Sequence, residues 1–283
     1  MSGVFVVADG VRLRAVVEGP ESGRPVLVLH GFTGSAESME GVASPLAADR
    51  RVARLELVGH GASDAPEAVA PYAMEACARQ VVAAASALGF ERPHLVGYSM
   101  GGRTALATAV AHPGRFSSVT LIGATAGIAD EGERAARIAA DEALADRIER
   151  EGLEAFVDHW MALPIFASQS RLGPDFLARA RAERLRQRPK GLANSLRGMG
   201  AGAQAPVWDG LGRVAAPVLL AVGGEDAKFR GIAASLSEAL PDARVEIIEG
   251  VGHAAHLEDA KAFADVLGGF LSEVERRSEG GRG

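Results

Sequence analysis

The chain contains 283 residues, of which 48% are hydrophobic and 23% are charged. This composition is typical of globular proteins and excludes the fibrous and largely disordered classes. The length allows one large domain, or a core of about 200 residues that carries an insert. Acidic residues outnumber basic residues by 36 to 30, and the resulting formal net charge of −6 argues against a nucleic-acid-binding surface.

The cysteine content and the length of the apolar runs indicate in which cellular compartment the protein resides. Cys77 is the single cysteine, so neither an intrachain disulfide nor a metal site built from several cysteines can form. No apolar run approaches the ~18 residues that a membrane-spanning helix needs, and the N-terminal residues do not resemble a secretory signal. We therefore expect a cytoplasmic protein that binds neither nucleic acid nor membranes and is a monomer or a weak homodimer.

Short apolar runs alternate with helical patterns in the first half of the chain. Two runs, at residues 4–8 and 11–18, flank Asp9-Gly10 and predict a β-hairpin. Further strands are predicted at residues 26–29, 51–57, 94–98 and 118–123, and helices at residues 72–88 and 101–111. This alternation predicts a mostly parallel sheet that opens with an antiparallel hairpin and has helices on both faces.

A long helical stretch then interrupts the alternation. Helices are predicted at residues 133–151, 153–161, 175–187 and 191–199, and strands resume at residues 217–222 and 244–248 with a helix at 232–240 between them. We therefore predict an eight-stranded core made of residues 1–125 and 203–272. A helical lid, residues 126–202, is inserted after the sixth strand, and residues 273–283 form a disordered tail.

The strongest motif is the Gly-x-Ser-x-Gly sequence at residues 97–101, with Ser99 at its centre. It follows a predicted strand and begins a predicted helix. In that context a sharp turn presents the serine hydroxyl above the sheet, and the flanking small residues let strand and helix pack closely. The alternative is a structural turn whose serine caps the helix. Because a histidine and an acid that could activate it follow later in the sequence, we interpret Ser99 as the reactive serine.

A reactive serine needs a histidine that takes its proton and an acid that orients the histidine. His253 comes directly after the last predicted strand, and Asp226 follows the seventh, so both lie at the carboxyl edge of the sheet. Glu225 is the competing acid, but Asp226 lies one residue further into the loop. His256 is the competing histidine; because it begins a predicted helix, a structural role is favoured.

An oxyanion site needs two N–H groups that converge on the developing negative charge. One is expected from Met100, directly after Ser99, and the other from Phe32 in the loop after the third strand. His30 and His60 lie in the loops after the third and fourth strands. We expect both histidines to fix loop structure rather than to take part in catalysis.

These motifs resemble those of the α/β-hydrolase superfamily and, within it, those of the 2-succinyl-6-hydroxy-2,4-cyclohexadiene-1-carboxylate synthases of menaquinone biosynthesis. The general features are residues 30–32 and 97–102. The more specific ones are residues 99–103, 135–137, 160–168, 190–200 and 224–229. The resemblance implies an α/β-hydrolase fold and an enzyme that eliminates pyruvate from a cyclohexene substrate without any cofactor or metal.

The resemblance also implies roles for individual residues. The Ser99–His253 pair would remove the proton alpha to the succinyl ketone, and the enolate oxygen would face the N–H groups of Phe32 and Met100. The small polyanionic substrate would be held by Arg103, Arg137 and Arg186, in a pocket lined by Tyr98 and Trp160. The structural alternatives are a surface ion pair between Arg137 and Glu133, and packing of Trp160 in the lid.

Two other classes of function remain open at this point. The same fold and triad serve carboxylesterases, lactonases and carbon–carbon bond hydrolases, although a neutral ester gives no reason for a set of arginines. A small-ligand receptor without catalytic activity is the second alternative. Replacement of Ser99 by Ala would leave ligand affinity intact in a receptor and abolish turnover in an enzyme.

Overall fold

The computed structural model describes residues 3–280, and its strands form one sheet in the order β1-β2-β4-β3-β5-β6-β7-β8. The strands are β1 (Val4–Ala8), β2 (Val11–Glu18), β3 (Arg24–Leu29), β4 (Arg50–Leu55), β5 (His94–Tyr98), β6 (Ser118–Ile122), β7 (Val218–Gly223) and β8 (Ala243–Ile248). β2 is antiparallel to β1 and β4, and all other neighbours are parallel. The predicted mostly parallel sheet with an opening hairpin is confirmed.

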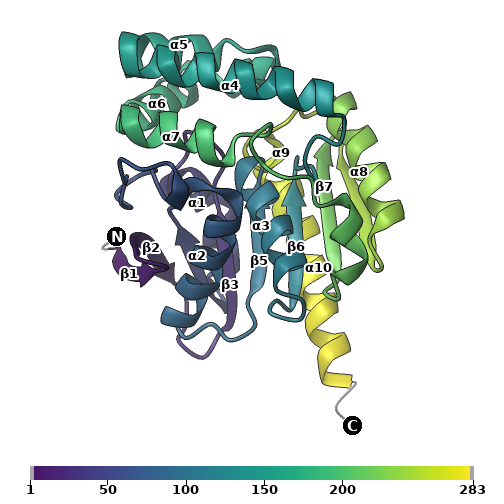
Figure 1. Ribbon diagram of the computed structural model, residues 1–283. Coiled ribbons are helices and arrows are strands. Elements are labelled where there is room, and N and C mark those ends of the chain that lie inside the picture. The colour runs from purple at the N-terminus through teal and green to yellow at the C-terminus, as the bar shows by residue number, and fades with distance from the viewer. Residues whose placement is uncertain (1–2, 281–283) are drawn as a thin grey trace.

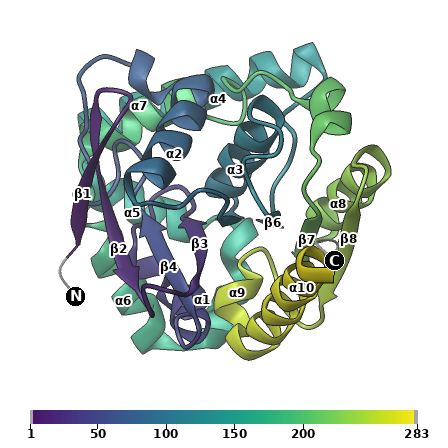
Figure 2. The same ribbon diagram turned by 90° about the horizontal axis from the view of Figure 1, so that it is seen from below.

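Helices cover both faces of this sheet, as the view from below shows (Figure 2). One face carries α2 (Met74–Ala87), α3 (Met100–Ala111) and α8 (Ala227–Ala239), and the other carries α1 (Glu40–Leu46) and α10 (Ala260–Gly280). Shorter elements in the connections are η1 (Glu37–Met39), η2 (Ala70–Tyr72), η4 (Trp208–Arg213) and α9 (Ala255–Glu258). Within residues 3–280, no helix combines the length and apolarity needed to cross a bilayer.

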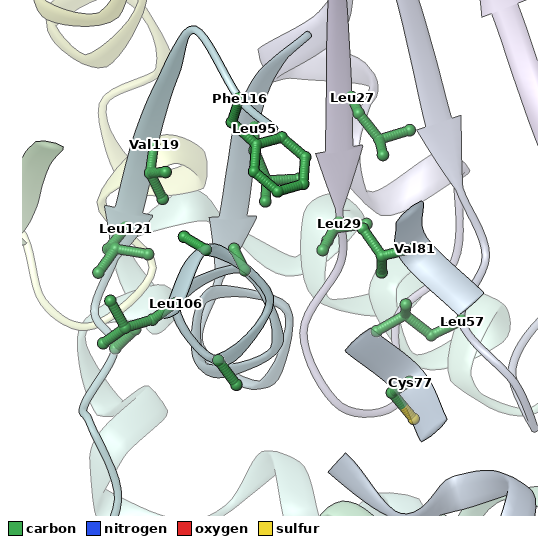
Figure 3. Close-up of a cluster of buried hydrophobic side chains, with 14 of the residues drawn as sticks. Leu27, Leu29, Leu57, Cys77, Val81, Leu95, Leu106, Phe116, Val119 and Leu121 are labelled. Carbon is green, nitrogen blue, oxygen red and sulfur yellow. The ribbon is translucent and has the colours of Figure 1, made fainter. Parts of the chain in front are cut away.

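Apolar side chains fill the space between the sheet and each layer of helices. On the first face, Leu29, Leu95 and Leu121 of the central strands share one buried cluster with Val81 of α2 and Leu106 of α3 (Figure 3). The cluster on the opposite face takes five side chains from α10, namely Phe263, Leu267, Phe270, Leu271 and Val274. Burial on both faces explains why the parallel strands are almost continuously apolar.

Residues 131–199, between β6 and β7, form a helical layer above the carboxyl ends of the strands (Figure 1). It consists of α4 (Glu131–Glu151), α5 (Leu153–Met161), η3 (Pro164–Leu172), α6 (Pro174–Arg184) and α7 (Pro189–Met199). These helices share a small apolar cluster that includes Ile148, Phe156 and Leu192. We call this segment the lid.

The predicted disordered tail is wrong for residues 273–280, which continue α10, while residues 281–283 lie outside the described part of the chain. Val274 packs beneath the sheet. The Glu275 carboxylate accepts hydrogen bonds from Nε and Nη2 of Arg50, both at 3.0 Å, and lies 3.3 Å from Nε2 of His94. Since Arg50 is on β4 and His94 on β5, these contacts hold the end of the helix against the sheet.

Glu275→Gln should lower the free energy of unfolding, because it removes the charged contacts of Glu275 with Arg50 and His94, and this loss should depend on pH. Burial alone would raise the pKa of Glu275, but hydrogen bonds from His94 and Arg50 outweigh it and lower the pKa to about 2, against about 4.3 in an unfolded chain. The stabilisation is therefore complete above the unfolded-state pKa and is lost as the pH falls toward the folded-state value. Urea unfolding should show a variant that is less stable by about 2 kcal/mol at neutral pH. This difference should shrink as the medium is acidified; a difference that is constant with pH would contradict the assignment.

Candidate active site

Ser99 occupies the turn between β5 and α3 with a φ of 51° and a ψ of −107°. A positive φ is strained for a residue that has a Cβ atom. Glycines make the tight turn feasible: a Cβ on Gly97 would lie 2.3 Å from the carbonyl oxygen of Gly101, and a Cβ on Gly101 would lie 2.5 Å from that of His30. The chain reverses sharply here, and Ser99 lines a cavity above the sheet.

His253 connects Ser99 to an acid. Its Nε2 lies 3.2 Å from Oγ of Ser99, and its Nδ1 lies 2.8 Å from Oδ2 of Asp226. The other oxygen of Asp226 accepts a hydrogen bond from the N–H of Phe229 at the start of α8, which fixes the carboxylate. Because the carboxylate favours a proton on Nδ1, Nε2 is left to accept the proton of Ser99. The structure therefore places the three predicted residues in one hydrogen-bonded chain.

Two further carboxylates stand close to this chain, in supporting positions. Glu225, the competing acid, binds both terminal nitrogens of Arg171 from η3 at 2.8 and 2.9 Å and so belongs to a lid-to-core ion pair. Glu258, which the sequence did not single out, accepts hydrogen bonds from the backbone N–H groups on either side of His253, at 2.8 and 3.3 Å. The loop that carries the histidine is thus held by a side chain from α9.

His256 is a buried structural residue. Its ring centroid lies 4.4 Å from that of Tyr98. Burial and the charge of the neighbouring His253 lower the pKa of His256 to about 3, so it is neutral at physiological pH. The Tyr98 ring also lies 5.5 Å from that of His253 and lines the cavity. Burial raises the pKa of Tyr98, which keeps its hydroxyl protonated.

The loop after β3 approaches the turn at Ser99 from the other side. His30 is buried, with Nδ1 hydrogen-bonded to the next carbonyl oxygen at 2.8 Å and Nε2 accepting from the N–H of Leu57 at 3.1 Å. His60 packs beside it, with ring centroids 4.9 Å apart. Both rings therefore hold neighbouring loops together. Phe32 and Met100, the predicted oxyanion donors, both line the cavity beside Ser99.

The cavity has a volume of about 470 Å³ and lies between the core and the lid. A volume of this order is typical of small-molecule sites. Its wall is mainly apolar and includes Trp160 of α5, whose ring centroid lies 5.1 Å from that of Phe32. Besides Tyr98 and His253, the ionisable residues that line it are Arg103, Arg137, Arg184, Lys228, Asp130 and Glu133. The lysine and arginine side chains in this wall outnumber its carboxylates, although the net charge of the whole protein is negative.

Arg103 and Arg137 line the cavity as expected, but their surroundings differ. Arg137 binds Oδ1 of Asp141 at 2.8 Å, one helical turn later, rather than Glu133 as the spacing had also allowed. Arg103 is buried, and its hydrogen bonds go to neutral oxygens. Burial and then the charge of Arg137 lower the pKa of Arg103 to about 10, which still leaves it positively charged at neutral pH.

The structure does not bring Arg186, the third arginine expected to hold the substrate, to the cavity. Its side chain is exposed, and Arg184 lines the cavity instead. Helix α6 ends at Arg184, three residues earlier than predicted, and the chain then turns toward Pro189. Arg184 is largely withdrawn from solvent, which lowers its pKa, and its Nε is buried without a hydrogen-bond partner in the described chain. Lys228, at the start of α8, is a further cavity residue that the sequence did not single out.

Comparison with known proteins agrees with this geometry. Residues 24–260 match the model of the alpha/beta hydrolase fold family. A Bacillus subtilis protein, provisionally named 2-succinyl-6-hydroxy-2,4-cyclohexadiene-1-carboxylate synthase, is 40% identical, with 95% of this chain and 98% of the relative covered. The synthase of that name from Serratia proteamaculans is 32% identical, with 90% and 96% covered. The solved structure of MenH from S. aureus has a TM-score of 0.88 at 28% identity, with 93% of this chain and 98% of that chain covered. The chain therefore belongs to the α/β-hydrolase family and, within it, to the 2-succinyl-6-hydroxy-2,4-cyclohexadiene-1-carboxylate synthases.

Proposed function

We propose that this protein eliminates pyruvate from 2-succinyl-5-enolpyruvyl-6-hydroxy-3-cyclohexene-1-carboxylate to give 2-succinyl-6-hydroxy-2,4-cyclohexadiene-1-carboxylate, without a cofactor. The observation that carries the proposal is the hydrogen-bonded chain of Ser99, His253 and Asp226 in a cavity whose wall contains three arginines. A triad by itself serves many reactions. The arginines favour a polyanionic substrate, and the similarity to named synthases supports this one.

The reaction begins with removal of the proton alpha to the succinyl ketone. In this proposal the oxygen of Ser99 takes that proton while His253 accepts the hydroxyl proton at Nε2, so the pair acts as one base. Asp226 stabilises the imidazolium that forms and keeps its ring in place. No acyl-enzyme is needed, because no bond between carbon and the serine oxygen forms.

The electron pair released by deprotonation first forms an enolate. Its oxygen lies where the N–H groups of Phe32 and Met100, at the start of α3, can stabilise the charge. Collapse of the enolate moves electrons through the ring double bond and breaks the bond between the ring carbon and the ether oxygen, which expels the enolate of pyruvate. This enolate takes up one proton on its methylene carbon and becomes pyruvate, which balances the proton that the enzyme removed. The ring keeps the new double bond, so the product is the cyclohexadiene, and the proton that was removed remains on the enzyme until it returns to solvent.

Arg103→Ala should lower kcat/KM for pyruvate release by about 100-fold, because loss of a charge-assisted hydrogen bond to a substrate carboxylate removes about 3 kcal/mol. Pyruvate can be followed by coupling its release to lactate dehydrogenase. Hydrolysis of p-nitrophenyl acetate, a neutral ester, reports on the triad without any contribution from a substrate carboxylate. Wild-type protein should release pyruvate efficiently and cleave the ester slowly.

Arg186→Ala is the matched control, since this exposed arginine does not line the cavity. It should leave both activities unchanged. Rapid ester cleavage that is indifferent to the loss of Arg103, with no pyruvate released, would overturn the proposal. The protein would then be a serine hydrolase on the same fold.

A further inference from the structure

Arg103 is 9% exposed and has neutral hydrogen-bond partners. Its Nη1 donates to the carbonyl oxygen of Met199 at 2.9 Å and to Oε1 of Gln204 at 2.7 Å. Within residues 3–280, no carboxylate lies within ion-pair distance of it, and Asp141, the carboxylate whose charge reaches it, is bound by Arg137 in the same wall. A buried guanidinium without a counter-ion is costly for the free protein. Its charge is therefore available to a ligand.

Gln204 is the side chain that holds this guanidinium in place. It lies in the turn after α7 and is 1% exposed. Its oxygen must face Arg103, because the amide nitrogen is a donor and would repel the guanidinium donors. The nitrogen, Nε2, is consequently buried without a hydrogen-bond partner among the described residues. An orphaned amide nitrogen is unfavourable, so a neutral amide at this position needs a reason other than stability.

A glutamate would fit the same space more favourably in the free protein. It would place an acceptor at the position of Oε1, replace the orphaned donor with a second acceptor, and supply the missing counter-ion for Arg103. The ion pair would also compensate most of the positive charge that Arg103 presents to the cavity. Stability and anion binding thus make opposite demands on this position.

We propose that Gln204 is a positioning residue that orients Arg103 while leaving its charge uncompensated for a carboxylate of the substrate. The inference rests on the proposed function in one respect, namely that the substrate is a polyanion. Gln204 acts through Arg103 and makes no contact with the reacting atoms in this scheme. Its replacement should therefore change KM far more than kcat.

The test compares Gln204→Glu with Gln204→Met, which keeps a similar shape without the acceptor. Gln204→Glu should raise KM for pyruvate release by about tenfold or more and change kcat by less than about threefold. Its melting temperature should equal or exceed that of the wild type, because the buried charge gains a partner. Gln204→Met should also raise KM, because Arg103 is no longer held, but it should lower the melting temperature.

Ala203→Glu is the matched control, since it adds the same charge at an exposed neighbouring position. KM should then stay within about twofold of the wild-type value. A Gln204→Glu protein with wild-type KM would overturn the inference. If that variant does not fold, a wild-type KM for Gln204→Met would overturn it equally.

Succinate binding separates failure of this inference from failure of the proposed reaction. Isothermal titration of the wild type with succinate, a small dianion, requires no turnover. Affinity should fall by about tenfold in Gln204→Glu and stay unchanged in Ala203→Glu. Equal affinities in wild type and Gln204→Glu would contradict the role of Gln204. Wild-type protein that releases no pyruvate would instead contradict the proposed function, whatever the succinate result.

Discussion

Asp226→Asn should reduce the rate of pyruvate release by about 10⁴-fold, the size of effect that the same exchange has in a serine protease triad. The amide would occupy the place of the carboxylate oxygen that lies 2.8 Å from Nδ1 of His253. An amide nitrogen at that position favours the tautomer with the proton on Nε2, and an amide oxygen carries no charge to stabilise the imidazolium. Steady-state kinetics with the pyruvate-coupled assay measures the loss.

Glu225→Gln provides the comparison, because it makes the same chemical change one residue away. Glu225 binds Arg171 at an exposed position, and exposed ion pairs contribute little. Its kcat should stay within about threefold of the wild-type value. If the two variants lost activity equally, the acid of the triad would have to be reassigned.

Gly101→Ala should damage both stability and activity. The added Cβ would lie 2.5 and 2.6 Å from the backbone oxygens of His30 and Leu29, and backbone cannot move aside as a flexible side chain can. Overpacking of this kind costs about 1–3 kcal/mol. The displaced segment leads into the loop that carries Phe32, and a shift of about 1 Å in such a group can cost about 100-fold in rate. Urea unfolding and pyruvate-release kinetics of the same preparation should show both effects.

Gly231→Ala is the control for a glycine in a helix. Gly231 lies in α8, and a Cβ there would meet no heavy atom within 4 Å. Since alanine is the better helix former, this variant should gain up to about 1 kcal/mol and keep full activity. A Gly101→Ala protein that behaved in the same way would show that helix α3 can move away from the loop after β3 without consequence.

The sheet, the sharp turn at Ser99 and the order of its partners could be predicted because each depends on a local pattern. The strands are short apolar runs, and the Gly-x-Ser-x-Gly motif specifies a turn through residues that adjoin one another in the sequence. Asp226 and His253 follow predicted strands, and parallel strands bring their carboxyl ends to one edge. For these residues, sequence position and spatial position are closely linked.

The basic residues of the lid could not be assigned in this way. Between residues 179 and 188 the sequence offers five arginines with the same chemistry, and tertiary packing decides which one reaches the cavity. Helix α6 stops at Arg184, so the residues after it take another direction. Gln204 carried no sequence signal at all, because its role depends on Arg103, a residue 101 positions earlier.

The end of α10 was missed for a different reason, since part of its signal was present. Phe263, Leu267, Leu271 and Val274 recur at helical spacing and share one face of the helix. The charged residues after them had favoured a disordered tail. The partners that settle the question, Arg50 and His94, lie about 180 to 225 positions away in the sequence, beyond the reach of any local pattern.

Helix α10 also has a consequence for how the protein reaches its native state. It is synthesised after every strand of the sheet, yet it supplies five of the buried side chains in the apolar cluster on one face of the sheet. Until residues 260–280 are synthesised, the other side chains of that cluster, among them Val26, Val28 and Val96, lack this cover. Such incomplete chains expose apolar surface and are prone to aggregate. The core on this face of the sheet therefore cannot be completed before residues 260–280 are synthesised, and we expect a nascent chain that lacks them to be aggregation-prone.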